Sequence, residues 1–407
     1  MSKENRRVPK LRFPGFTEDW EQRKLGSIGS TYTGLSGKTK EDFGHGEAQY
    51  ITYLNVFQNT ISNITMTDKV EIDTTQTEVK YGDVLFTTSS ETPEEVGMSS
   101  VWLGDTPNTY LNSFCFGFRP KQKIDLYFLG YSLRAPYMRD KIKILAQGIS
   151  RYNISKNKVM ELEISLPNNE EQNLLGNFLR HIDLIITLHQ RKLNNLKLKK
   201  KALLQKLFPK NGERYPELRF PGFTDAWEQR KADYIFKSVT EKGYPELPVL
   251  SASQELGMVY RNQNGIDIQH DKKNESSYKR VSPGQFVIHL RSFQGGFAYS
   301  EVKGITSPAY TVMSFKNSSE QYGLFWKYVF KSETFIKRLE TITYGIRDGR
   351  NISFSDFKSL MLQYPSFLEQ ELIGDLIAII ESGITLHQRK LDHLQLQKKA
   401  LLQQMFV

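Results

Sequence analysis

Two segments of the chain carry apolar residues at alternating steps of three and four, the spacing of a helix with one apolar face. A histidine and a lysine interrupt this seam in each segment. The spacing is typical of a coiled coil and predicts two long helices that pair with one another; the alternative is an amphipathic helix that packs on its own domain. The first seam consists of Ile182, Ile186, His189, Leu193, Leu196, Lys200, Leu203 and Leu207, and the second of Ile380, Ile384, His387, Leu391, Leu394, Lys398, Leu401 and Met405.

The segments before these helices alternate short β-rich runs with turn-forming residues, and each contains a helical stretch, near residues 126–145 and 322–339. Each of these variable blocks is large enough to fold independently. We therefore predict an α+β fold, with two mixed α/β domains joined by the two long helices. The β-rich runs are Gln49–Phe57, Asp83–Thr88, Ser113–Phe118, Gln285–Leu290 and Thr311–Phe315.

The chain is an internal repeat, which determines its organisation. The first arm, Pro9–Leu25 (PKLRFPGFTEDWEQRKL), matches the second arm, Pro216–Ala232, at 13 of 17 positions. Ile186–Phe208 matches Ile384–Phe406 at 17 of 23 positions, and the blocks between these segments share little. We assign residues 1–167 to the first arm and domain, 168–208 to the first helix, 209–365 to a linker with the second arm and domain, and 366–407 to the second helix.

The charge of the chain lies mainly on the two helices. The 407 residues include 55 Lys and Arg against 45 Asp and Glu, a net charge of +10. Ile186–Phe208 holds seven basic residues and no acid, and Ile384–Phe406 holds four basic residues and Asp392, so the helices account for the whole surplus. A basic surplus favours a polyanionic partner such as nucleic acid. Any DNA-facing surface on the two blocks must then be a local patch.

Compartment and redox chemistry follow from what the sequence does not contain. No apolar run approaches the roughly 20 residues that a membrane span needs, and no apolar stretch near residue 1 is typical of a secretory signal. The single cysteine, Cys115, excludes an intrachain disulfide and a multi-cysteine zinc site. These features indicate a cytoplasmic protein.

The chain contains near matches to catalytic motifs and no complete one. Tyr32–Thr39 (YTGLSGKT) ends like a phosphate-binding loop but has Tyr32 where the first glycine is required. Glu78–Lys80 and Glu301–Lys303 resemble the Glu-x-Lys of metal-dependent nucleases but have no suitably separated Asp to complete a Mg²⁺ site. We therefore expect a non-catalytic chain that binds no metal or cofactor of its own.

The repeats resemble the specificity subunit of type I restriction–modification enzymes over essentially the whole chain. The resemblance rests on the twin LRFPGFT-x-x-WEQRK arms, on the Glu-Gln pair that opens each helix after Leu-Pro or Tyr-Pro, and on the twin ITLHQRKL…KKALLQ helices. It implies two target-recognition domains in inverted orientation, held apart by two antiparallel conserved helices.

The resemblance also implies a function and a set of partners. Such a subunit recognises an asymmetric, bipartite site on double-stranded DNA, with one half-site for each domain. Methyltransferase (modification) subunits, expected to number two, methylate adenine with S-adenosylmethionine. Motor-nuclease (restriction) subunits cut unmodified DNA with ATP and Mg²⁺. These cofactors belong to the partner subunits, and the chain itself is expected to be non-catalytic.

Two other functions are compatible with the sequence. A stand-alone two-domain DNA-binding protein would have the same architecture without enzyme partners, and a coiled-coil adaptor would bind no DNA. Co-purification with a methyltransferase subunit excludes the first alternative, and salt-dependent binding to duplex DNA excludes the second.

Side chains that contact DNA are expected on loops of the two blocks, where Arg, Lys, Asn, Gln, Ser, Thr and Tyr suit base edges. Arg151 and Arg347 are the leading pair, because each follows a Gly-Ile and precedes an Asn-Ile-Ser. The candidates are Lys38, Thr39, Lys40, Ser89, Ser90, Thr92, Arg151, Tyr152 and Asn153 in the first block, and Ser251, Ser253, Gln254, Arg291, Ser292, Gln294, Arg347 and Arg350 in the second.

The two helices are expected to run antiparallel, because a parallel pair would stack Lys200 on Lys398. Aligning the two seams end to end places His189 opposite Lys398 and Lys200 opposite His387. A neutral imidazole can accept a hydrogen bond from an ammonium group. Polar residues at seam positions cost stability but penalise slipped registers.

Overall fold

The computed structural model describes residues 8–210, 212–253, 256–261, 272–289, 296–340 and 352–407. The chain forms two compact units, unit 1 with residues 1–190 and 389–407, and unit 2 with residues 191–388. Each unit contains one variable block and a part of each long helix. Helices α6 (Asn169–Lys206) and α11 (Phe367–Gln404) have 38 residues each, about 57 Å at 1.5 Å per residue. The predicted combination of mixed α/β domains and two long helices is confirmed.

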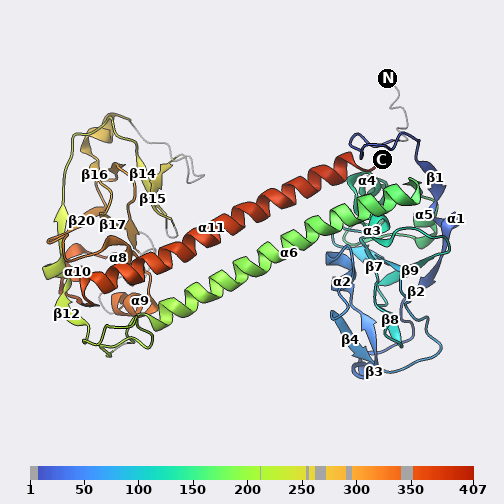
Figure 1. Cartoon of the computed structure of the whole chain (residues 1–407), viewed down its shortest axis with the longest axis horizontal. Coiled ribbons are helices and arrows are strands. Elements are labelled where there is room, and N and C mark those ends of the chain that lie inside the picture. The colour runs from blue at the N-terminus through green and yellow to red at the C-terminus, as the bar shows by residue number, and fades with distance from the viewer. Residues whose placement is uncertain (1–7, 211, 254–255, 262–271, 290–295, 341–351) are drawn as a thin grey trace. The chain divides into compact units, whose positions relative to one another are not determined.

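The block of unit 1 contains two larger sheets and the two-stranded sheet β10-β6. The antiparallel sheet has the order β2-β9-β5-β7, and the second sheet has the order β4-β3-β8, in which β3 and β8 are parallel (Figure 1). Apolar residues of the first sheet and of α3 and α4 form the main core. The bounds are α1 (Leu25–Ile28), β2 (Gly29–Thr33), β3 (Phe43–Ile51), α2 (Tyr53–Gln58), β4 (Thr67–Val70), β5 (Val84–Thr87), β6 (Ser89–Ser90), β7 (Ser99–Val101), β8 (Thr109–Leu111), β9 (Cys115–Pro120), α3 (Leu126–Arg134), α4 (Pro136–Ile144), β10 (Tyr152–Asn153) and α5 (Lys156–Met160), with a 3-10 turn at Lys40–Asp42.

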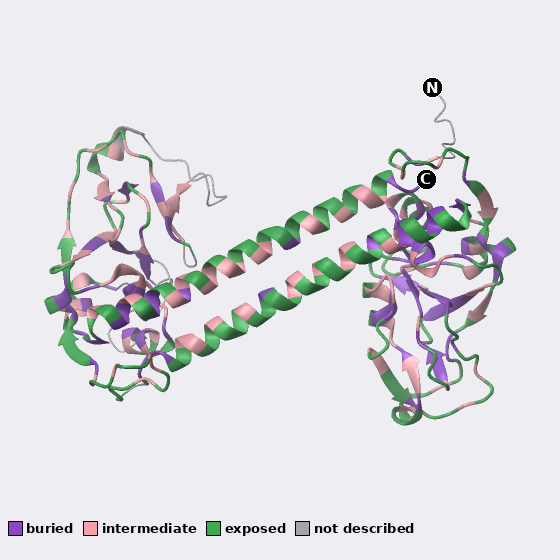
Figure 2. Ribbon diagram, in the orientation of Figure 1, coloured by how far each residue is buried: buried purple, intermediate pink, exposed green. Residues whose placement is uncertain are grey.

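The block of unit 2 is built around the antiparallel sheet β13-β20-β17-β18, with the two-stranded pairs β14-β15 and β16-β19 beside it. An aromatic core joins this sheet to α8, α9 and α10. Buried residues concentrate in the sheets and their covering helices, whereas most residues along α6 and α11 are exposed or half-buried (Figure 2). The bounds are α7 (Ala232–Ile235), β13 (Phe236–Val239), β14 (Leu250–Ser253), β15 (Gly257–Tyr260), β16 (Lys279–Val281), β17 (Phe286–Ile288), β18 (Phe297–Tyr299), β19 (Gly304–Thr306), β20 (Thr311–Phe315), α8 (Gly323–Val329), α9 (Glu333–Glu340) and α10 (Phe354–Ser359), with a 3-10 turn at Lys272–Ser277.

Local capping changes one predicted strand, and both predicted helical stretches are divided, the one near 322–339 into α8 and α9. The run predicted over 49–57 is a strand only as far as Ile51. Thr52 accepts a hydrogen bond from the Asn55 backbone N–H and so begins helix α2, because a capped first turn overrides strand propensity. The helical stretch near 126–145 consists of α3 and α4, which meet at Pro136, whose missing N–H favours the first position of a new helix.

Each repeated arm forms a strand that pairs with the strand leading into a long helix. In unit 1, β1 (Glu21–Lys24) pairs antiparallel with β11 (Glu163–Leu166). In unit 2, β12 (Glu228–Lys231) pairs in the same way with β21 (Met361–Tyr364). The sequence repeat is therefore a repeat of tertiary pairing.

The arms also hold the first turn of each helix through buried ion pairs. Arg12 donates from Nε and Nη2 to the two carboxylate oxygens of Glu171, at 2.7 and 2.8 Å. Arg219 makes the same two bonds to Glu369, at 2.8 and 2.9 Å. Both glutamates have no exposed side-chain surface. A buried carboxylate needs such a bidentate partner to offset its lost hydration.

The arms also contact the ends of the long helices. In unit 1, the Leu11 backbone N–H donates to the Gln404 carbonyl, and Trp20 packs edge-on against Phe406. In unit 2, Leu218 donates to Lys206, and Trp227 packs against Phe208 in the same manner. The first arm therefore binds the end of α11, and the second arm binds the end of α6.

The two long helices run antiparallel, as predicted. In unit 2, Lys200 Nζ lies 2.6 Å from Glu381 Oε1, and a Cβ built on Gly383 would lie 3.4 Å from Leu196 Cδ1. Residue numbers therefore fall along α6 as they rise along α11. Every residue of the two predicted seams is buried or half-buried, with Leu193 only 1% and Leu391 only 4% exposed.

The predicted register is wrong. Lys398 Nζ lies 2.6 Å from Asp183 Oδ1 in unit 1, and Lys200 binds Glu381 in unit 2, so each lysine meets a carboxylate six residues before the expected histidine, His189 or His387. A charge-assisted bond to a carboxylate is stronger than a bond to a neutral imidazole. The competing partners lie outside the seam pattern, so the helical spacing did not reveal them.

Candidate nucleic-acid interface

A short hairpin in unit 1 presents the leading candidate, Arg151. Backbone bonds between Gln147 and Asn153, at 2.9 and 2.8 Å, close the hairpin. Gly148 has φ +137°, and a Cβ there would lie 2.0 Å from the Arg151 carbonyl oxygen, so only glycine fits. At the tip, Ile149 is 95% exposed, and Arg151 is also exposed. The hairpin therefore holds a basic and an apolar side chain out into solvent.

The base of this hairpin pairs with a second candidate segment. Tyr152 lies opposite Ser90, and Asn153 lies opposite Ser89, in the two-stranded sheet of β10 and β6. Two predicted segments about sixty residues apart in sequence therefore come together. Ser89 and Ser90 are buried, and the Ser89 carbonyl accepts a bond from the Tyr53 hydroxyl at 2.6 Å. The two serines thus support the hairpin from within the fold.

A cavity of about 340 Å³ with a mixed polar and apolar lining lies beside these strands. Thr33, Ser36, Thr88, Ser113 and Lys156 supply its polar lining. Cys115 also lines the cavity, and burial raises the pKa of its thiol above the usual range. A neutral thiol is a poor nucleophile and a poor metal ligand. The cavity is therefore better suited to hydrogen bonding than to covalent chemistry.

The remaining candidates of the first block differ in whether their side chains are already bound within the fold. Lys38 pairs with Asp73 at 2.8 Å, and this hydrogen bond, with others from Thr75, holds the pKa of Asp73 well below its usual value. Thr39 caps the 3-10 turn through Asp42, and Thr92 donates to Glu95. Lys40 is exposed. Among the described residues, Arg151 and Lys40 are thus the basic candidates of this block that form no ion pair.

Fewer candidates of the second block can be placed. Ser251 and Ser253 lie half-buried on β14, and the Ser253 hydroxyl accepts a bond from the Leu256 backbone N–H at 3.3 Å. Their role in DNA contact stays a prediction. The candidates that fall outside the described residues are Gln254, Arg291, Ser292, Gln294, Arg347 and Arg350.

Sequence reasoning missed the charged contacts that hold each unit together. Tyr131 donates to Asp183 at 2.7 Å, and Tyr328 donates to Glu381 at 2.9 Å, so each carboxylate binds both a tyrosine and a lysine. The Arg12–Glu171 pair was also missed. Its signal was present, since both residues recur in the second copy, but a repeat does not indicate which of its members touch.

Neither a metal centre nor a membrane helix is found in the described part of the chain. No three His, Cys, Asp or Glu side chains there gather closely enough to hold a metal ion. Among the same residues, no helix combines the length and the apolar character needed to cross a membrane.

Comparisons with known proteins agree on one family. Residues 17–198 match the model of the type I restriction modification DNA specificity domain. The chain is 23% identical to the type I restriction enzyme MjaX specificity subunit of Methanocaldococcus jannaschii, over 95% of this chain and 92% of the relative.

Solved structures share the fold. The type I restriction–modification S subunit from M. genitalium has a TM-score of 0.62 at 16% identity, covering 98% of this chain and 99% of that one. A chain from a structure describing assembly and conformational transition of the type I restriction–modification system has a TM-score of 0.50 at 15% identity, covering 97% and 98%.

Proposed function

We propose that this chain belongs to the specificity-subunit family of type I restriction–modification systems. In that role it selects the DNA sites on which partner subunits act. The chain is the DNA specificity subunit, and the chemistry belongs to its partners. Methyltransferase subunits supply S-adenosylmethionine and methylate adenine, with two such subunits expected. Restriction subunits supply ATP-driven movement and Mg²⁺-dependent cleavage of unmodified DNA.

The main observation behind this proposal is that the same set of arm contacts recurs in both units, whereas the blocks between them differ. The arm strand, the Arg–Glu pair and the Trp–Phe contact recur in both units. The blocks differ, since unit 1 has the three-stranded sheet β4-β3-β8 beside its main sheet, whereas unit 2 has the two-stranded pairs β14-β15 and β16-β19 in the described residues. Equivalent scaffolds with different recognition surfaces suit a target composed of two different half-sites.

In unit 1 the hairpin around Arg151 is the candidate reader of one half-site. An exposed arginine on a rigid support can donate two hydrogen bonds to the edge of a guanine, which is the commonest specific contact to DNA. Tyr152 and Asn153 support this presentation from β10.

Reconstituted methylation tests the proposed function. The purified chain is incubated with duplex DNA and S-adenosylmethionine, with and without type I methyltransferase subunits, and methylated adenines are mapped by single-molecule sequencing. We expect no methylation by the chain alone and a single two-part motif with the partner. Adenine methylation by the chain alone, or methylation without a motif, contradicts the proposal.

Arg151→Ala sharpens the test, with Lys158→Ala as the matched control because Lys158 is an exposed basic residue on the neighbouring helix α5. Arg151→Ala should lower the preference for the correct base at one position of one half-site by about 1–3 kcal/mol. The other half of the motif should be unchanged. The control should leave the whole motif unchanged. An equal loss at every sequence would assign Arg151 to phosphate contact.

A further inference from the structure

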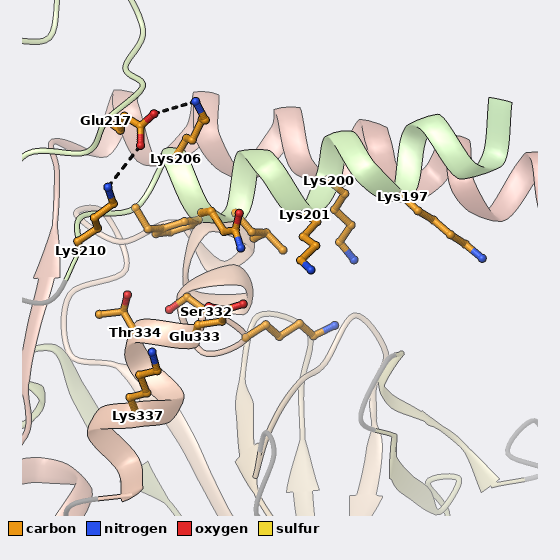
Figure 3. A pocket seen from close by; sticks show the side chains of 14 residues that line it. Lys197, Lys200, Lys201, Lys206, Lys210, Glu217, Ser332, Glu333, Thr334 and Lys337 are labelled. Carbon is orange, nitrogen blue, oxygen red and sulfur yellow. Dashed lines mark ion pairs between the residues drawn. The ribbon is translucent and has the colours of Figure 1, made fainter. Parts of the chain in front are cut away.

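Unit 2 contains a cavity of about 710 Å³ whose lining is dominated by lysine (Figure 3). We call it the lysine pocket. One side is formed by the last turns of α6, which carry Lys197, Lys200 and Lys201; Lys200 and Lys201 point toward the side on which α9 begins. Ser332, Glu333 and Thr334 lie on the opposite side. The seven lysines of the lining are Lys197, Lys200, Lys201, Lys206, Lys210, Lys331 and Lys337.

Part of this positive charge is not used inside the fold. Lys200 binds Glu381, and Glu217 binds both Lys206 and Lys210, at 2.7 and 3.5 Å. The other acid of the lining, Glu333, is exposed at the first position of α9. Three further lysines of the lining, Lys197, Lys201 and Lys337, are exposed and form no ion pair within the described ranges. These ammonium groups are available to an anion.

The twin position in unit 1 shows that the scaffold does not require these lysines. At the 198-residue offset, Lys197 and Lys206 correspond to Gln395 and Gln404, while Lys200 and Lys201 are kept as Lys398 and Lys399. The helices α9 and α4 also correspond, because Tyr328 and Tyr131 occupy equivalent positions before them. Lys337 then corresponds to Asp140, and Lys10 takes the place of Glu217.

Lys331 corresponds to a residue with a purely internal role. Its counterpart, Arg134, is buried and donates to the backbone carbonyls of Val56, Phe57 and Asn59. Burial lowers the pKa of Arg134 to about 10. Lys197, Lys206 and Lys337 therefore have no basic counterpart in unit 1, and the counterpart of Lys331, Arg134, is turned into the fold.

The composition of the pocket indicates the kind of anion. Seven lysines line it, and no arginine does. Protein–protein interfaces are enriched in Arg and aromatic residues and depleted in Lys, and bidentate carboxylate recognition favours Arg. Flexible point charges that stay hydrated suit a row of phosphates, whose neutralisation releases counterions. A DNA backbone therefore fits this lining better than an acidic protein segment does.

We propose that the lysine pocket binds backbone phosphates of DNA, and that it gives unit 2 a sequence-independent hold on the duplex which unit 1 does not share. The inference rests on the proposed function, since it assumes that DNA is the ligand of the chain. The two units would then differ in two ways. They read different half-sites, and unit 2 alone would add phosphate contacts that hold the duplex.

Equilibrium binding at several salt concentrations tests the proposal. The full chain, with and without type I methyltransferase subunits, is titrated against its own site and against a scrambled duplex. The pocket variant is Lys197→Gln/Lys201→Gln/Lys337→Gln. The matched control is Lys192→Gln/Lys199→Gln/Lys399→Gln, which removes the same charge from exposed lysines that do not line the pocket. Thermal unfolding verifies that both variants are folded.

We expect the pocket variant to lose affinity for both duplexes by the same factor, with a slope of log K against log salt that is shallower by about 0.9 for each phosphate contact removed. The control should keep the wild-type slope. An unchanged slope in the pocket variant, or equal loss in both variants, overturns the proposal. So does a variant that binds DNA normally but no longer binds the methyltransferase subunit, because the occupant is then protein.

The two proposals fail in different ways. If the wild type prefers its site but the pocket variant behaves like the wild type, the pocket proposal is wrong and the proposed function stands. If the wild type does not distinguish its site from the scrambled duplex while the pocket variant shows the shallower slope, the proposed function is wrong and the pocket stands.

Discussion

At the scale of single residues, the two glutamates that open the long helices are fully buried charges. Glu171 and Glu369 have no exposed side-chain surface, and each depends on one arginine of an arm. The Gln that follows each of them is also bound within the fold, since Gln172 and Gln370 donate to the backbone carbonyls of Pro167 and Pro365. These repeated motifs therefore serve the fold, and their repetition is explained without assigning them to DNA.

Arg12→Ala should destabilise unit 1 strongly. The variant leaves the Glu171 carboxylate buried without its partner, which costs about 3–5 kcal/mol. Chemical denaturation measures the loss, and Arg23→Ala is the control, since the Arg23–Glu21 pair is exposed and should contribute little. If both variants unfold at the same denaturant concentration, the buried pair does not support the fold as argued.

At the scale of elements, the register of the helix pair is set by two equivalent clusters of tyrosine, carboxylate and lysine. Tyr131 and Lys398 meet at Asp183, and in unit 2 Lys200 and Tyr328 meet at Glu381. Leucine seams alone permit several registers, because one Leu replaces another at little cost. A half-buried carboxylate does not, because slippage would leave it without hydrogen bonds.

Glu381→Gln should remove a pH-dependent part of the stability. Burial acts to raise the pKa of Glu381, but the hydrogen bond and charge of Lys200, with the charges of Lys327 and Lys331, leave the pKa below its ordinary value of 4.5. The folded chain thus binds fewer protons here than the unfolded chain, so this stability is complete above the unfolded pKa and is lost as the pH falls through the folded pKa.

The difference in free energy of unfolding between the wild type and Glu381→Gln should therefore be about 1–3 kcal/mol near neutral pH and should shrink below the unfolded pKa of 4.5. Denaturation series across this range measure it. The control is Glu371→Gln, on the same helix. Its free energy of unfolding should differ from that of the wild type by the same amount at every pH. A Glu381→Gln difference that stays constant with pH would contradict the role given to this carboxylate.

At the scale of the whole molecule, each arm contacts the end of a long helix, so the arms and helices follow one another in a closed cycle. The first arm binds the end of α11, and the second arm binds the end of α6, through the same backbone contact. Only the second of these junctions is joined covalently, through residues 209–215. Since the first arm and the end of α11 are in contact in the same way as the covalently joined second pair, we expect the fold to tolerate a link at the first junction and a break at the second.

A circular permutant should therefore fold and keep its recognition site. Val407 is joined to Pro9 by a copy of the natural joint PKNGERY, and the chain is opened between Gly212 and Glu213. We expect a melting temperature close to that of the wild type and the same methylated motif with the methyltransferase subunits. A permutant opened between Arg23 and Lys24 interrupts the β1–β11 pairing and should lose stability. Equal stability of both permutants would show that the arm pairing is dispensable.

The sequence by itself determined the features that depend on local spacing and on repetition. The sequence pattern located α6 and α11 within three residues of their ends, and the twin arms indicated the resemblance to type I specificity subunits. The antiparallel direction also followed, since like charges disfavour the alternative. Arg151 was chosen as a candidate DNA contact from a Gly-Ile and an Asn-Ile-Ser at matching places, but neither the hairpin that carries it nor its support by Ser89 and Ser90 was foreseen.

Only the tertiary structure decided which of these features touch. The partner of Lys398 is Asp183, more than two hundred residues away, and no periodicity links them. The lysine pocket likewise combines the end of α6 with the start of α9. Helical spacing describes one segment at a time, whereas register and pocket arise from competition between side chains brought together by folding. That competition is decided by burial and charge pairing, which the linear order of residues does not contain.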